Sequence, residues 1–213
     1  MTTAPHSFAG CSIVACATVR GELEQLRQSG LLDADRVLYA APGLHEWPDR
    51  FETQVPRRLQ AAREVSDRVL VAYGARCYVD TANPARTTDA LIREQGINAA
   101  RIDAANCMDM LASKQEREHI AGKDNVLWLT PGWLRHWDFI FKDWDVGKYN
   151  EMFPRYDKAV VLDALGYVDE LMAESPERFL EISDKMQLPI DSAPVSLERL
   201  SRLLTAKLAA VMS

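Results

Sequence analysis

The sequence predicts an α/β protein in which a doubly wound, mainly parallel sheet is flanked by helices. Short apolar runs alternate along the chain with longer amphipathic stretches, which is the order that strand–helix units produce. Several of these runs, such as RVLVAY and KAVVLDA, are continuously apolar and do not alternate with polar residues. Continuous runs are typical of parallel strands that are covered on both faces.

Seven segments have the composition and length of strands. Each is short and apolar, and turn-forming residues or amphipathic stretches separate it from the next. In chain order they are residues 12–16, 36–41, 68–73, 99–102, 125–130, 158–163 and 187–191.

The amphipathic stretches between these segments predict helices. Two of them end at Gly30 and Gly96, because glycine is the residue that most readily ends a helix. Pro48 stands where a first helical turn accepts proline, whereas Pro56 should kink or divide the same helix. Helices are expected within residues 20–30, 47–65, 85–96, 106–122, 132–144, 168–186 and 194–213.

The length and composition predict one domain spanning residues 1–213. The 213 residues, 47% of them hydrophobic, are enough to bury one sizeable core. Residues 1–10 are expected to be flexible ahead of the first strand, and residues 194–213 to form a C-terminal helix.

The charge and the termini restrict the class of protein. A net charge of −6 argues against nucleic-acid binding by bulk electrostatics. The longest apolar runs are too short to span a bilayer, and MTTAPHSFAG lacks the pattern of a secretory signal. We therefore expect a cytoplasmic protein, in which the four cysteines are core residues, ligands or nucleophiles and not disulfides.

Cysteines and histidines follow the predicted strands, at the ends where sites form in this fold class. Three of the four cysteines and two of the four histidines fall at this predicted edge of the sheet. Cysteines that only fill a core should not favour one edge. In chain order the residues are Cys16, His45, Cys77, Cys107 and, one helical turn beyond the fifth strand, His136 with Asp138.

Such a set suits metal coordination. Zinc accepts three thiolates and one imidazole in a tetrahedral array, so it is the first expectation. An iron–sulfur cluster with a non-cysteine fourth position is the second. The local spacings do not decide, since the sequence has neither C-x-x-C nor H-E-x-x-H.

Each candidate also has an ordinary structural interpretation. Cys16, at the end of an apolar strand, fits plain packing, and His45 fits a solvated loop. Cys107 opens a predicted helix, where the helix dipole would favour a thiolate, so a metal-free thiol enzyme using Cys107 stays open. The four tryptophans of WLTPGWLRHWDFIFKDW fit either a core or a subunit interface. The second interpretation predicts a homodimer.

Familiar nucleotide and hydrolase motifs do not occur in the sequence. No G-x-G-x-x-G follows the first strand, and the sequence has neither a Walker A lysine loop nor a G-x-S-x-G elbow. Ordinary dinucleotide binding, P-loop chemistry and α/β-hydrolase chemistry are therefore not expected.

The order of these motifs resembles the domain-of-unknown-function 1638 family of bacterial and archaeal proteins, over roughly residues 12–195. The matching features are a cysteine that ends the first strand before RGELEQL, a G-L-H loop, a cysteine after Y-G, a cysteine before a hydrophobic helix, and T-x-x-x-L-R-H-x-D. Here they are Cys16; Gly43, Leu44, His45 and Pro48; Cys77; Cys107; and Thr130, Leu134, Arg135, His136 and Asp138.

Two positions depart from the family pattern. Members usually carry the second cysteine close behind Y-G, whereas here Ala75 and Arg76 intervene. Members also tend to have a histidine before the later cysteine, where this chain has Asn106. Any activity tied to that histidine is therefore in question for this chain.

The resemblance implies an association with corrinoid-dependent methyl transfer. Together with the strand-end pattern, it leads us to expect a metal site at Cys16, Cys77 and Cys107 with His45 as the fourth ligand or a neighbouring group, acting in one-carbon or methyl transfer. The groups expected around the metal or facing a substrate are Glu22, Tyr73, Arg135, His136 and Asp138. The alternative is a non-catalytic accessory protein that binds a methyltransferase or corrinoid protein through its tryptophan-rich segment.

Overall fold

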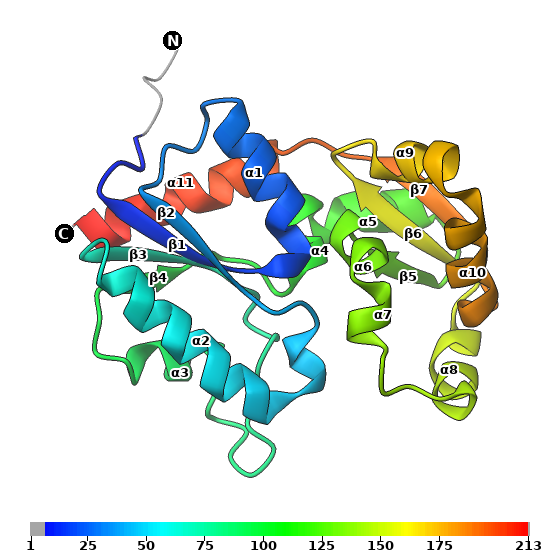
Figure 1. The fold of residues 1–213 in the computed structure, drawn as a ribbon, viewed down its shortest axis with the longest axis horizontal. Coiled ribbons are helices and arrows are strands. Elements are labelled where there is room, and N and C mark those ends of the chain that lie inside the picture. The colour runs from blue at the N-terminus through cyan, green and yellow to red at the C-terminus, as the bar shows by residue number, and fades with distance from the viewer. Residues whose placement is uncertain (1–6, 213) are drawn as a thin grey trace.

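A computed structural model describes residues 7–212, which form two parallel sheets with helices on both faces (Figure 1). The strands are β1 (Cys11–Cys16), β2 (Arg36–Ala40), β3 (Arg68–Ala72), β4 (Ala99–Arg101), β5 (Val126–Leu129), β6 (Lys158–Asp163) and β7 (Ile190–Pro194). The α-helices are α1 (Arg20–Gln28), α2 (Pro48–Arg63), α3 (Thr88–Arg93), α4 (Cys107–Leu111), α5 (Lys114–Ala121), α6 (Pro131–Arg135), α7 (Trp137–Ile140), α8 (Val146–Met152), α9 (Tyr167–Glu174), α10 (Pro176–Met186) and α11 (Glu198–Met212).

Every strand pair in the described residues is parallel, which confirms the predicted fold class. The first sheet has the order β2-β1-β3-β4 and the second the order β5-β6-β7. The sequence predicted one sheet, whereas the chain builds two. An apolar pattern identifies a strand but not its partner, so the division after β4 could not be seen in the pattern.

The continuous apolar runs are explained by helices on both faces of the first sheet. Alternate residues of β1 enter different cores: Ile13 packs with α1 and α11, and Val14 packs with α2 and α3. Both side chains have no exposed surface. The chain returns to this sheet at its end, because α11 comes after β7 and covers the face shared with α1 (Figure 1).

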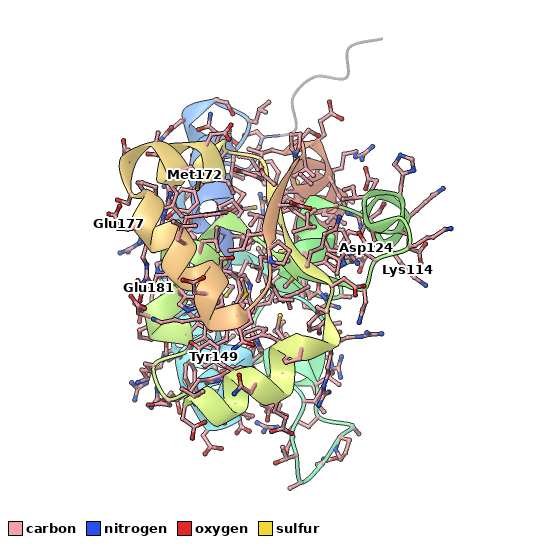
Figure 2. The ribbon with its side chains drawn as sticks, turned by 90° about the vertical axis from the view of Figure 1, so that its right-hand side faces the viewer. Lys114, Asp124, Tyr149, Met172, Glu177 and Glu181 are labelled. Carbon is pink, nitrogen blue, oxygen red and sulfur yellow. The ribbon has the colours of Figure 1, made fainter. Side chains whose placement is uncertain are left out.

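The second sheet is covered in the same way. Val161 of β6 packs with α6, α7 and α10, and its neighbour Val160 faces the side of α4 and α5. Helix α10 is amphipathic, with Ile182 and Met186 buried and Glu177 and Glu181 exposed on its outer face (Figure 2).

The strands lie close to their predicted positions, with one exception. The seventh strand was expected at residues 187–191 and lies at Ile190–Pro194. Gln187 adopts a left-handed conformation (φ 56°) that ends α10. The residues directly after it connect the helix to the sheet, so the strand begins later than predicted.

Four predicted helices differ from expectation in continuity. Pro56 does not divide α2, whose buried Val55 and Leu59 hold the helix against the sheet. The stretch 106–122 is divided into α4 and α5, because Ser113 forms a capping box with Glu116 and starts a new helix. The stretch 132–144 is divided into α6 and α7, and the stretch 168–186 is divided before Pro176 into α9 and α10. Within residues 7–212 no helix combines the length and apolarity needed to cross a membrane.

The N-terminal end of the described chain is packed. Phe8 is buried in the same core as Val211 of α11, and its backbone N–H donates to Asp33. Of the segment 1–10 that was predicted to be flexible, Phe8 is therefore packed, Ser7, Ala9 and Gly10 are exposed, and residues 1–6 lie outside the described residues.

We expect Leu204→Ala to lower the free energy of unfolding by about 2–5 kcal/mol, because it opens a cavity between α11 and the first sheet. Denaturant unfolding measures the change. Arg202→Ala is the control, since Arg202 is exposed on the same helix and should change stability by less than about 0.5 kcal/mol. Equal effects would show that α11 does not complete this core.

Candidate functional site

Three of the four cysteines converge at the carboxyl edge of the first sheet. Cys16 is the last residue of β1, Cys77 lies in the turn after β3, and Cys107 is the first residue of α4, after β4. The three are close enough to influence one another's ionisation, and all are free thiols. Cys11, at the opposite end of β1, is also a free thiol but is buried in the core with α11.

Backbone hydrogen bonds hold the loops of Cys77 and Cys107 together. Ala75 N–H donates to Ala104 O (2.9 Å) and Arg76 N–H donates to Ala105 O (3.0 Å). These are the two residues that depart from the family pattern, and here they join one loop to the next. Gly74 permits the contact, because a Cβ at this position would lie 2.4 Å from Ala105 O.

Arg101 joins the loop ahead of Cys107 to α3, a role that no motif in the sequence indicated. Its Nε and Nη2 donate to the two carboxylate oxygens of Asp89 (2.7 and 3.0 Å). Its Nη1 donates to Ile102 O (2.5 Å) and Ala104 O (3.1 Å). A planar guanidinium that bonds a carboxylate with one edge and carbonyls with the other fixes the loop ahead of Cys107.

Asn106 has a structural role at the position where family members tend to have histidine. Its Oδ1 accepts from Asp109 N–H (2.9 Å) and caps α4 directly before Cys107. Asp109 in turn accepts from Ala105 N–H (2.9 Å) and pairs with Arg199 of α11 (3.1 Å). The helix that presents Cys107 is therefore anchored at its first turn.

Burial governs the ionisation of the three thiols. It raises the pKa of Cys107 to about 11, and the nearby Cys16 adds to this increase. The pKa of Cys77 is raised by burial and by Cys107, and that of Cys16 by burial, although Thr18 Oγ1 donates to Cys16 Sγ (3.1 Å). The expected thiolate-favouring helix effect on Cys107 is outweighed, since α4 has only five residues. At neutral pH the metal-free thiols are protonated.

His45 is connected to the cysteines by Trp133, whose side chain contacts both His45 and Cys107. It lies in a short 3-10 helix after β2, with a side chain 37% exposed. Its ring centroid is 5.4 Å from that of Trp133, whose side chain lies beside Cys107. Partial burial lowers the pKa of His45, so its imidazole is neutral at pH 7 and able to act as a ligand.

Several buried polar groups around the cysteines have no hydrogen-bond partner within residues 7–212. They are both carboxylate oxygens of Glu22, the hydroxyl of Tyr73 and Nε1 of Trp133. Burial raises the pKa of Tyr73 well above its ordinary value, and the neighbouring Cys16 and Cys77 contribute. Unpartnered buried groups are rare in proteins, and here they gather beside the thiols.

The two sheets meet at this site through a close backbone contact. Thr130, directly after β5, donates its hydroxyl to Thr18 O (3.1 Å). Gly132 lies against the same carbonyl, and a Cβ at this position would be 2.1 Å from Thr18 O. The contact brings α6 against the first turn of α1, so that Arg135 and His136 line one cavity with Glu22.

Asp138 does not join this group. It pairs with Arg178 (2.7 Å) and Lys185 (3.9 Å) of α10, and its side chain is 70% exposed. The chain turns at His136 between α6 and α7, which directs Asp138 towards α10 and away from the cysteines.

The tryptophan-rich segment forms core, in agreement with the first of its two interpretations. Trp133 and Trp137 are 9% and 1% exposed. The ring centroids of Trp137 and Phe141 are 4.2 Å apart, and Trp144 packs on Phe141. Phe139 of the same segment is 42% exposed, so binding of a partner or a second copy through this segment stays a prediction.

The thiols do not form a finished metal centre. Across residues 7–212, no three or more His, Cys, Asp or Glu side chains are arranged to hold a metal ion. What the structure provides is three neighbouring thiols with a neutral imidazole nearby.

Comparison with known proteins identifies the family. The chain matches the family described as "Protein of unknown function (DUF1638)" over residues 39–204, most of its length, and so belongs to that family. His45, Cys77 and Cys107 lie within the matched residues, and Cys16 and Glu22 lie ahead of them. Searches of curated proteins and of solved structures return no match.

We expect Gly132→Ala to lower the free energy of unfolding by about 1–3 kcal/mol, because the new methyl group would push against the Thr18 carbonyl. Denaturant unfolding measures the change. Gly147→Ala in α8 is the matched control, since the atom closest to its Cβ is a side-chain oxygen of Asp145 at 3.2 Å. No difference between the two variants would contradict the close contact.

Glu22 should make stability depend on pH. Burial raises its pKa from the ordinary value of 4.5 to about 7, so the folded protein retains a proton that the unfolded chain loses. The stability of the wild type, relative to Glu22→Gln, should fall by about 3 kcal/mol as pH rises from 4.5 to 7 and stay level above. Denaturant unfolding of both proteins across this range measures the difference, and parallel curves would contradict the assignment.

Proposed function

We propose that this member of the DUF1638 family binds a thiophilic metal through Cys16, Cys77 and Cys107, with His45 as fourth ligand or as a group beside the metal. Zinc is the first candidate and an iron–sulfur cluster the second. The observation that carries the proposal is the convergence of three free thiols from three separate strand ends. Cys11, at the opposite end of β1, stays apart from them.

Metal binding would have to draw the thiols closer than they stand without metal, since they do not form a complete ligand set. Cys77 is the thiol placed to move, because it lies in a turn closed by its N–H bond to Gly74 O (3.1 Å). Cys16 ends a buried strand and Cys107 opens an anchored helix. The two would act as fixed points for the incoming metal.

The proposal includes a chemical role. A zinc ion with three protein thiolates has a fourth position for His45, a water or a substrate thiol, and in that position it lowers the pKa of the bound group. Corrinoid-linked one-carbon or methyl transfer is the reaction class that the family resemblance suggests, with a methyltransferase or corrinoid protein as partner. The alternative of a metal-free thiol enzyme is less favoured, because a Cys107 with pKa about 11 is protonated at pH 7.

The test is metal analysis of anaerobically purified protein by plasma mass spectrometry, together with its visible spectrum. We expect about one zinc per chain and no colour, whereas iron with a broad visible band would identify a cluster. Because the thiols must lose protons, zinc affinity should rise steeply with pH. A wild-type protein that neither contains metal nor binds added zinc or iron would overturn the proposal.

A cysteine pair supplies the control. Cys107→Ala should lower metal content well below that of the wild type, whereas Cys11→Ala should leave it unchanged, because Cys11 lies in a separate core. Circular dichroism confirms that both variants are folded. Equal metal content in the two variants would remove Cys107 from the ligand set.

A further inference from the structure

A second candidate site lies where the two sheets meet. A cavity of about 260 Å³ is lined by the first turn of α1, by α6 and by Leu165 after β6. It lies outside the carboxyl ends of β1, β5 and β6, which is where open parallel sheets bind ligands. At liquid density its volume corresponds to about nine water molecules, which suits a small metabolite.

Two arginines line the cavity together with one carboxyl group, that of Glu22, which is near enough to Arg135 for the guanidinium to oppose the rise of its pKa. The arginines are Arg20 and Arg135, and neither forms an ion pair with any residue in the described range 7–212. Their guanidinium groups lie over aromatic rings, Arg20 at 5.0 Å from Tyr39 and Arg135 at 4.6 Å from Tyr167. Both arginines are near enough to His136 to lower the pKa of its imidazole. A guanidinium group presents its N–H donors in a planar fork that matches carboxylate and phosphate, so Arg20 and Arg135 are the lining residues suited to an oxyanion.

Glu22 provides the independent sign of a ligand. Its side chain lines the same cavity and has no exposed surface, yet neither carboxylate oxygen has a hydrogen-bond partner within residues 7–212. The carboxyl side chain of Asp163, also buried nearby, is by contrast satisfied by the N–H groups of Leu165 and Val168. A buried carboxyl group without a protein partner is expected to bond to something the cavity contains.

We propose that this cavity binds a small molecule with a carboxylate or phosphate group, held by Arg20 and Arg135, and that Glu22 hydrogen-bonds to another polar group of the same molecule. The two arginines select for the anion, and the buried Glu22 orients the rest of the molecule. The inference is independent of the metal, because none of the three cysteines lines the cavity.

The probes are inorganic phosphate, acetate and glycolate, each added at millimolar concentration and compared with sodium chloride at the same ionic strength. Thermal unfolding and tryptophan fluorescence measure binding, the latter through Trp133, next to the cavity residue Gly132. A rise in Tm with phosphate alone would identify a phosphate-bearing ligand, and a rise with the carboxylates alone a carboxylate. We expect glycolate to exceed acetate, because its hydroxyl group can bond to Glu22.

Matched arginine variants locate the binding. Arg135→Gln and Arg20→Gln should each weaken binding and raise the apparent Kd about tenfold or more, since each removes a charged hydrogen-bond donor. Arg57→Gln should leave the apparent Kd unchanged, because Arg57 is exposed on α2 and does not line the cavity. The inference is overturned if no probe raises Tm above the chloride control, or if Arg135→Gln and Arg57→Gln bind alike. Neither outcome bears on metal content.

Discussion

The site depends on one backbone contact, the seating of Gly132 and Thr130 on the carbonyl of Thr18. The cavity is lined by residues that follow strands of both sheets, so the loops of one sheet alone would not enclose it. The contact places the end of β5 against the end of β1, so that residues from both sheets share one interior. It also requires glycine at residue 132, because the Cβ of any other residue would clash with the Thr18 carbonyl and hold the two sheets apart.

A second constraint is the cost of the polar groups buried at this junction. Each unpartnered buried group costs about 1–3 kcal/mol, and Glu22, Tyr73 and Trp133 all incur it within the described residues. Tyr73 and Trp133 lie beside the thiols and Glu22 lines the arginine-lined cavity, whereas Trp137, whose Nε1 is also unpartnered within residues 7–212, lies in the core of the second sheet. The two proposed sites therefore lie next to each other, with Glu22 close enough to raise the pKa of Cys107.

Much of the fold and part of the site could be predicted from the sequence. The apolar runs identified the strands because both sheet faces are covered, and strand ends then indicated Cys16, Cys77 and Cys107. Asp138 lies with Arg178 and Lys185 of α10 and apart from the cysteines, because the chain changes direction at His136, which the pattern of the sequence did not indicate. The structural role of Arg101 could not be predicted, since a single arginine at a strand end has no pattern that distinguishes it from a surface residue. The two-sheet arrangement depends on strand partners, which local patterns do not specify.

The return of α11 to the first sheet has a consequence for biosynthesis. The chain builds all four strands of the first sheet, then the whole second sheet, and only then the helix that covers Ile13 and Leu70. Multidomain chains generally fold from the N-terminus as they are synthesised. Here the N-terminal half cannot complete its core in that order, because α11, which covers one face of the first sheet, comes after the second sheet in the chain. That apolar face stays open in a nascent chain until the second sheet and α11 have been synthesised.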